Sequence, residues 1–367
     1  MAPVAAPAMG VAPAAVGFFV SLVYLGSMVG TATAGDWVGR FGPIRVSQIG
    51  LLLCLAGLAL AASGWMPAVL AGALLIGLGY GPATPASSLI LARTAPPGMI
   101  ALTFSIKQTG VPLGSAIAGA AIPALVLAVG WQGAALAVGV ACAALAVAII
   151  PTRERYDAER NPAARLSLRS AFAPVALVLR DRTLTELSLV SLVYAGMQIT
   201  LIAYLVSFLT ESFSLSLVLA GMVMAVSQIA SVAARIVWGV VADRLATRRF
   251  TLGMLGVGMG VTAMFAIASG PHWPLWALFA FAMAFGATAV GWNGVFLAEV
   301  ARLAPRDRIS DATGGAGFFT FLGVVVTPPL FNLVLHLTGS YAITYALFGV
   351  PALLVGLRLL LTARISS

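Results

Sequence analysis

The sequence predicts an all-α membrane protein, and three features of its composition support that fold class. Of its 367 residues, 61% are hydrophobic and only 8% are charged, whereas a soluble domain carries about 25% charged residues. The mean hydropathy is +1.05, which reflects more apolar surface than a water-soluble core needs. The charges also stand between long apolar stretches instead of being spread along the chain.

Apolar segments that are long enough for two helices each define the elements. Five stretches are free of charge apart from Glu211: 46–92, 108–152, 187–234, 250–298 and 312–357. A helix needs about 20 apolar residues to cross the hydrocarbon core, so each stretch holds two crossings and a turn. Turn residues gather near Gly64, Gly130, Glu211, Gly270 and Gly339. Segment 1–35 is long enough for one crossing, which makes eleven membrane helices in total.

Basic residues occupy alternate loops and thereby predict the orientation. Apart from Lys107 and Arg235, every Lys and Arg lies in or beside the loops near 40–45, 93, 153–182, 244–249 and 302–308 or in the C-terminal tail. Positive charge marks the cytoplasmic side. We therefore expect a multi-pass protein of the bacterial inner membrane, with its C-terminus in the cytoplasm and, after eleven crossings, its N-terminus in the periplasm.

One long polar stretch, residues 151–183, divides the chain. It carries 11 of the 31 charged residues, more than any other predicted loop. We expect a linker that contains a short amphipathic helix lying on the membrane surface. The predicted organisation is a first helical bundle over 1–150, a cytoplasmic linker over 151–183 and a second bundle over 184–367.

Composition and motifs also exclude several classes of protein. The net charge is +9, but the basic residues follow the loops instead of one exposed face, so nucleic-acid binding is not expected. Cys54 and Cys142 are isolated in apolar runs, which is too little for a disulfide framework or a metal site. The sequence contains no nucleophile constellation and no phosphate-binding loop. We therefore predict no metal, no cofactor and no enzymatic activity.

A glycine-rich motif occurs twice. The chain reads GDWVGRFG at 35–42 and GVVADRLA at 239–246. Three pairs align with a common spacing of 204 residues: Gly35 with Gly239, Arg40 with Arg244 and Arg45 with Arg249. Thr109-Gly110 and Thr313-Gly314 keep the same spacing. Paired halves of this kind are typical of many secondary transporters.

The motif and its context resemble the major facilitator superfamily, whose loop signature Gly-x-x-x-Asp-Arg-x-Gly lies between the second and third helices of each half. The resemblance covers essentially the whole chain. It implies two pseudo-symmetric helical bundles, twelve helices around a central cavity, and halves that rock to expose the cavity to each side. We expect a monomer in which eleven of the twelve helices are present. The second half has two crossings before its motif and the first has one, so a truncated or misassigned start is expected.

The resemblance implies that the charged residues of the two motifs, Asp36, Arg40, Asp243 and Arg244, form a conformational latch. Asp243 occupies the family's aspartate position, whereas Gly39 occupies it in the first half and Asp36 lies three residues earlier. In the family this carboxylate lies by a helix N-terminus of the other half, where the helix dipole favours an anion. Asp243 would meet the helix that starts near residue 100, and Asp36 the one near 310. The alternative for both is a solvated charge.

Arg235 is the first candidate for solute binding, because a charge within a membrane span is costly and usually functional. Gln228 and Ser231 precede it at helical spacing and share its face. The region resembles the membrane monocarboxylate carriers of the same superfamily, which implies that Arg235 binds a carboxylate through its forked donors. The alternatives are a gate arginine that pairs with Asp243 and a side chain that extends to the cytoplasmic interface.

The remaining predicted site residues are polar side chains within spans: Lys107, Gln108, Tyr194, Gln198 and Asn293. Lys107 lies about two turns into its helix, where it could attract an anion, pair with an acid or extend to the interface. Tyr194 and Gln198 are four residues apart and share a helix face. Each of these groups suits a polar cavity, and each could equally bond a neighbouring helix.

These residues favour a secondary transporter of a small organic anion such as a monocarboxylate, with a proton as a candidate coupling ion. The first alternative is efflux of hydrophobic or cationic compounds, which leads one to expect a carboxylate in the cavity. Two departures weaken drug efflux: Ala73 replaces the family's arginine four residues before Gly77, and Ser115 stands where the antiporter signature has proline. The second alternative is a non-transporting remnant or a receptor on the same fold.

Overall fold

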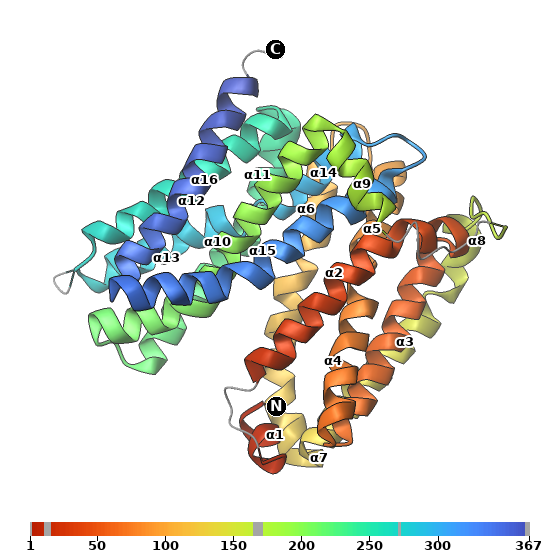
Figure 1. Ribbon diagram of the computed structural model, residues 1–367, viewed down its shortest axis with the longest axis horizontal. Coiled ribbons are helices and arrows are strands. Elements are labelled where there is room, and N and C mark those ends of the chain that lie inside the picture. The colour runs from red at the N-terminus through yellow and green to blue at the C-terminus, as the bar shows by residue number, and fades with distance from the viewer. Residues whose placement is uncertain (1, 11–15, 164–171, 271–272, 364–367) are drawn as a thin grey trace. The chain divides into compact units, whose positions relative to one another are not determined.

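The computed structural model describes residues 2–10, 16–163, 172–270 and 273–363, and within these ranges all regular elements are helices (Figure 1). The chain divides into two compact units. Unit 1 comprises Met1–Arg93, Leu113–Thr185 and Leu303–Phe321, and unit 2 comprises Thr94–Pro112, Glu186–Arg302 and Leu322–Ser367. Each unit therefore combines most of one half of the sequence with a short segment of the other half.

Unit 1 contains three long helices, α2, α3 and α4, that lie side by side (Figure 1). Its helices are α1 (Ala2–Ala8), α2 (Val16–Phe41), α3 (Pro43–Ala62), α4 (Met66–Tyr80), α5 (Ala83–Thr94), α7 (Gly110–Ala148) from Leu113 on, η2 (Ile150–Thr152), α8 (Arg153–Tyr156), α9 (Ala173–Arg180) and the first part of α15 (Ile309–Thr338). Small residues are frequent along these helices, and they allow close packing of helix backbones in a membrane.

Gly130 divides α7 into two helical stretches. Its backbone angles are φ 73° and ψ 171°, a conformation that glycine adopts without a steric penalty because it has no Cβ. The Cβ position of Gly64, in the turn between α3 and α4, lies 3.8 Å from the ring of Trp131. These two predicted turns therefore lie at the same end of unit 1.

Ten helical stretches within the described ranges are long and apolar enough to cross a membrane. The predicted count of eleven is not confirmed. The difference arises in the segment 108–152, for which we predict a turn near Gly130. There, one candidate span, Ala121–Tyr156, runs through the backbone break at this glycine. Length and composition do not separate two short helices that follow each other without a polar loop.

Unit 2 is packed around an aromatic core. Its helices are α6 (Ile100–Gln108), α10 (Arg182–Phe213) from Glu186 on, α11 (Leu217–Arg244), α12 (Arg248–Phe265), η4 (Ala266–Ala268), α13 (Leu275–Ala289), α14 (Asn293–Leu303), the rest of α15, and α16 (Tyr341–Ala363). The helices α12 and α16 lie side by side (Figure 1), and α6 packs on α11. The fully buried Tyr345 contacts the rings of Phe208, Phe285 and Phe331 at centroid distances of 5.0 to 5.6 Å. Such aromatic pairs contribute about 0.5–1.5 kcal/mol each beyond area burial.

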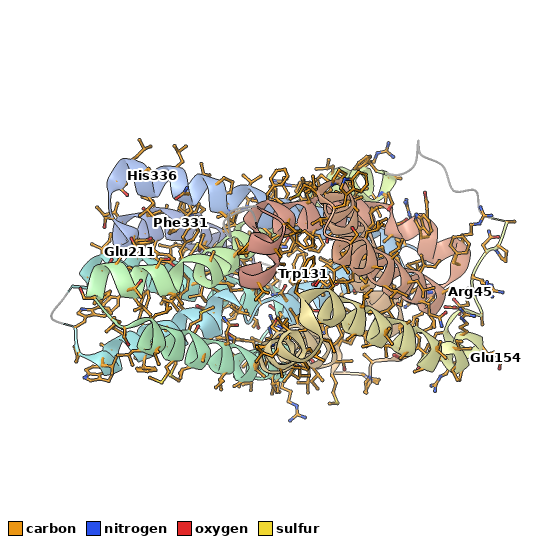
Figure 2. All side chains as sticks on the ribbon, turned by 90° about the horizontal axis from the view of Figure 1, so that it is seen from below. Arg45, Trp131, Glu154, Glu211, Phe331 and His336 are labelled. Carbon is orange, nitrogen blue, oxygen red and sulfur yellow. The ribbon has the colours of Figure 1, made fainter. Side chains whose placement is uncertain are left out.

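The charged end of unit 1 is closed by the beginning of the predicted linker. The Asp157 carboxylate accepts hydrogen bonds from the backbone N–H groups of Ile44 (2.8 Å) and Arg45 (3.1 Å) at the start of α3. A carboxylate at a helix N-terminus is favoured by the helix dipole. Figure 2 shows Arg45 and Glu154 together at this end of unit 1 and Trp131 toward the other end.

The predicted linker contains two short helices, α8 and α9, and its residues 164–171 lie outside the described ranges. In α9, Pro174 and Val178 are buried against Gly315 of α15, whereas Arg180 is exposed. This one-sided burial is an amphipathic pattern. The location of α9 on the membrane surface and the division into bundles at 1–150 and 184–367 stay predictions.

The orientation of the chain in the membrane can be tested by labelling its two ends. We expect a cysteine placed by Ala8→Cys, at an exposed position of α1, to react with a membrane-impermeant maleimide in intact cells, and one placed by Ser366→Cys to react only after lysis. The physical reason is that the basic loops face the cytoplasm and an odd number of crossings separates the ends. Cys54 and Cys142 are replaced by alanine in both variants. Labelling of both ends from one side would contradict the count of eleven helices.

Candidate functional site

The Arg235 guanidinium lies buried between α11, α6 and α13, with 2% of the residue exposed. Its Nε donates to the carbonyl of Val290 at 3.0 Å, and its Nη1 donates to the carbonyl of Gln108. Gln108 ends α6, and Val290 lies in the break between α13 and α14. Carbonyls at a helix end lack partners within the helix. The guanidinium is therefore held by backbone groups that two helix ends make available.

Lys107 is a second cation that contacts Gln108. Lys107 Nζ donates to Oε1 of Gln108 at 3.0 Å, so the side chain and the backbone of Gln108 contact Lys107 and Arg235 respectively. Gln108 is 8% exposed, and Lys107 is half-buried. Charges repel more strongly where the effective dielectric constant is lower than in water. Two neighbouring cations in such a place make a positive field that favours a small anion.

Small residues bring α6 close to α11 and α14. A Cβ at Gly294 would collide with the backbone of Ser105 on α6, and a Cβ at Gly239 would lie 2.9 Å from the Cα of Leu102. Glycine leaves room for this approach, as small residues do in membrane helix packing generally. The position of Lys107 relative to α11 therefore depends on both glycines.

Gln198, Trp292 and Asn293 form a second hydrogen-bonded group, close in the chain to Val290. Oε1 of Gln198, on α10, accepts from the Trp292 indole Nε1 at 3.2 Å and from Asn293 Nδ2 at 3.0 Å. Trp292 is fully buried, whereas Gln198 and Asn293 are half-buried. The segment 290–293 thus supplies both the carbonyl that holds Arg235 and the donors that hold Gln198. The break between α13 and α14 joins the two groups.

Tyr194 contacts this site through Trp292. The tyrosine is fully buried, its hydroxyl donates to the Leu252 carbonyl at 2.8 Å, and its ring packs edge-on against Trp292 with centroids 5.8 Å apart. The Gln228 side chain contacts a residue of its own helix, with Nε2 3.8 Å from Sδ of Met224. Of the seven predicted solute-binding residues, the structure therefore brings Lys107, Gln108 and Arg235 into one hydrogen-bonded group and Gln198 and Asn293 into another.

The described acidic residues of unit 2 each have a side-chain partner. Their partners are Arg249 and Arg358 for Glu186, Tyr341 for Glu211, Arg248 for Asp243 and Arg302 for Glu299. Each of these four carboxylates therefore has a side-chain partner of its own.

The second motif lies at the N-terminus of α6. The Asp243 carboxylate accepts from the backbone N–H groups of Ala101 (3.0 Å) and Leu102 (2.8 Å), and Arg248 Nη2 lies 3.2 Å from it. The Asp243 side chain is 1% exposed. Arg244 is exposed. Asp243 thus connects the second half of the sequence to a helix of the first half, and the latch role of these two residues stays a prediction.

The first motif has a different arrangement. Gly35 lies directly against the Asp311 side chain in the first turn of α15, and Asp311 pairs with Arg308 at 2.7 Å. Here α15 brings its own carboxylate to the motif, beside the half-buried Asp36 and Arg40. The latch role of Asp36 and Arg40 also stays a prediction.

Two contacts were not predicted from the sequence: the Val290 carbonyl with Arg235, and Asp157 with the N-terminus of α3. The Val290 carbonyl gives no signal through its residue type, although the neighbouring Gly291 is the kind of residue that marks a helix break. Asp157 stands among several charges of the predicted linker, and nothing in that pattern distinguishes it as the residue that caps α3.

Comparison with known proteins identifies the family. The family model described as Major Facilitator Superfamily matches residues 1–328 of this chain. The chain belongs to the major facilitator superfamily. The resemblance inferred from the repeated motif is thereby confirmed, and so is the assignment to the multi-pass membrane proteins of transmembrane transport that make up this superfamily.

Several solved structures of the major facilitator superfamily have the same fold at low sequence identity. The Escherichia coli fucose:proton symporter FucP matches with a TM-score of 0.74 and 15% identity, over 95% of this chain and 91% of that one. The proton:xylose symporter XylE matches with a TM-score of 0.74 and 16% identity, over 97% and 88%. The human organic anion transporter MFSD10 matches with a TM-score of 0.73 and 19% identity, over 98% and 88%. At these identities the likeness concerns the fold alone.

One curated relative matches a shorter part of this chain. The nitrate/nitrite transporter NrtP of Nostoc punctiforme is 25% identical over 138 residues, which is 38% of this chain and 27% of that protein. The match therefore spans about a quarter of the relative's length.

Proposed function

We propose that the chain is a secondary active transporter that carries a small organic anion, such as a monocarboxylate, by alternating access. The observation that carries the proposal is the pair of cations, Arg235 and Lys107, that meet at Gln108. A charge within a membrane span costs at least about 2.5–3.5 kcal/mol on insertion scales, so charges there are expected to serve binding. A carboxylate would neutralise part of this field.

The guanidinium suits a carboxylate for a geometric reason. It carries five N–H donors in a planar fork that matches two carboxylate oxygens. The carbonyls of Val290 and Gln108 orient this fork, so Arg235 does not have to be ordered when the solute binds. Ordering side chains on binding costs affinity, which makes a held guanidinium a better anion site than a mobile one.

Nitrate is a second candidate solute, favoured by the partial match to a protein named nitrate/nitrite transporter. Nitrate and carboxylates are both small planar oxyanions, and one guanidinium fork suits either. Efflux of cationic compounds is less favoured, because Glu186 and Glu299 are paired with arginines. A non-transporting remnant is the outcome expected if no solute binds.

The finer features of the carrier belong to the same proposal. We take the stretches before and after Gly130 as two crossings, which gives eleven membrane helices, and place the protein as a monomer in the bacterial inner membrane. A proton is the proposed coupling ion, since the fucose and xylose carriers are named as proton symporters.

Binding to the purified 367-residue chain in lipid nanodiscs tests the proposal. Dissociation constants are measured by ligand-observed NMR titration with propionate, nitrate and tetramethylammonium. We expect propionate to bind and tetramethylammonium not to bind. Binding of tetramethylammonium alone would contradict the anion proposal, and binding of nitrate alone would favour an inorganic anion. Uptake of labelled propionate into proteoliposomes then tests transport.

A further inference from the structure

The orientation of the Gln198 amide is determined by its neighbours. The indole N–H of Trp292 is a donor only, so the Gln198 atom 3.2 Å from it is the carbonyl oxygen. The same oxygen accepts from Asn293 Nδ2 at 3.0 Å. Gln198 therefore directs its NH₂ group away from Trp292, and Asn293 directs Oδ1 away from Gln198.

The donor that sets this orientation is rigidly supported. Trp292 is fully buried, and its ring contacts Tyr194 and Phe296 at centroid distances of 5.8 and 5.3 Å. The Tyr194 hydroxyl is itself bonded to the Leu252 carbonyl. With the indole packed on both rings, its N–H cannot turn away from Gln198.

The two outward groups, Nε2 of Gln198 and Oδ1 of Asn293, are available to a solute. Within the part of the chain that the structure describes, neither atom has a hydrogen-bond partner. Neither belongs to the buried polar atoms of that part that lack a partner, so both keep accessible surface. A donor beside an acceptor is the complement of a hydroxyl group, which accepts one hydrogen bond and donates another.

This pair lies near the proposed carboxylate site. Arg235 is bonded to Val290, and Asn293 is three residues further along. Consecutive Cα atoms are about 3.8 Å apart, so the Cα atoms of Val290 and Asn293 are separated by at most about 11 Å. One short segment, residues 290–293, therefore contacts both Arg235 and Gln198.

We propose that Gln198 and Asn293 form a hydroxyl-binding subsite, and that the anion held at Arg235 and Lys107 is a small hydroxycarboxylate. The inference rests on the proposed function, because it takes the anion site as given. It adds a second recognition point, so that the site distinguishes a hydroxy acid from the unsubstituted acid of the same length. A site built to bond a hydroxyl rejects the analogue that lacks it, since its polar groups would be left unpaired.

Matched pairs of acids test this subsite. Dissociation constants of lactate and propionate, and of 3-hydroxybutyrate and butyrate, are measured by ligand-observed NMR on the full chain in nanodiscs. The members of each pair have the same charge and carbon chain and differ in one hydroxyl. We expect at least one hydroxy acid to bind about fivefold or more tightly than its partner, which corresponds to the net value of about one hydrogen bond.

Two substitutions assign the preference to these residues. Asn293→Leu removes the acceptor, and Trp292→Phe keeps an aromatic ring but removes the N–H that orients Gln198. Both are expected to lower the ratio of the two dissociation constants within each pair to about one, whatever the change in the propionate constant itself. Elution at the wild-type volume in size-exclusion chromatography shows that each variant is folded. Tyr204→Phe is the matched control, because it removes a hydroxyl of α10 that bonds Pro328 elsewhere, and it should leave the preference unchanged.

The outcomes separate this inference from the proposed function. Equal binding within both pairs, or a preference that survives both substitutions, would overturn the hydroxyl subsite and leave the anion proposal standing if propionate still binds through Arg235. Failure of every carboxylate to bind the wild-type chain would overturn both.

Discussion

Arg235→Ala is expected to raise the dissociation constant of propionate more than about 100-fold. Hydrogen bonds to a charged group contribute about 1.5–3 kcal/mol each, and a two-pronged pair therefore accounts for two or more factors of ten. The measurement is the NMR titration in nanodiscs described above. A variant that binds propionate as the wild-type chain does would rule out Arg235 as the counter-charge.

Arg235→Lys separates charge from geometry. Lysine keeps the positive charge but loses the planar fork, so we expect binding about tenfold weaker than wild type and stronger than in Arg235→Ala. Arg358→Ala is the matched control: it removes one arginine charge from unit 2 at a side chain that is 64% exposed and paired with Glu186. It should change propionate binding less than about twofold. An equal loss in the control would show that net charge alone governs affinity.

Asp243→Asn is expected to shift the conformational balance about tenfold or more, and further than Asp36→Asn does. The carboxylate of Asp243 caps α6 through Ala101 and Leu102 while contacting Arg248. An amide supplies one acceptor atom instead of two and removes the charge. Losing a charge-assisted bond costs about 1.5–3 kcal/mol, which corresponds to roughly a tenfold to hundredfold change in population.

The balance can be followed through a cysteine at Ser105, which is fully buried on α6. In a background without Cys54 and Cys142, the maleimide labelling rate of Ser105→Cys should rise when α6 separates from α11. Asp157→Asn is the matched control, because Asp157 caps α3 with the same geometry inside unit 1; it should leave the rate unchanged. An equal or larger rise with Asp36→Asn would show that the first motif does the latching.

The fold class and the family are predictable from the sequence because both depend on patterns that need no tertiary contact. The cost of polar groups in lipid requires long apolar runs, and Glu211 alone interrupts those of this chain. The spacing from Gly35 to Gly239 shows the repeat directly in the residues. The same reasoning was weakest for the helix count, because the break at Gly130 is a backbone event inside one continuous apolar stretch.

Residue types and spacing are sufficient to predict that the chain crosses a membrane, that it belongs to the major facilitator superfamily, and that Arg235 and Lys107 are charges in predicted membrane spans. The contacts of these charges depend on how the helices pack. Arg235 bonds the carbonyl of Gln108, 127 residues away, and Asn293 bonds Gln198, 95 residues away. The physical reason is that a backbone carbonyl is the same in every residue type, and the direction of an amide depends on which donor packs against it. Residue type and spacing therefore predict neither the carbonyl that Arg235 bonds nor the orientation of the Gln198 amide. Both depend on which helix ends pack together.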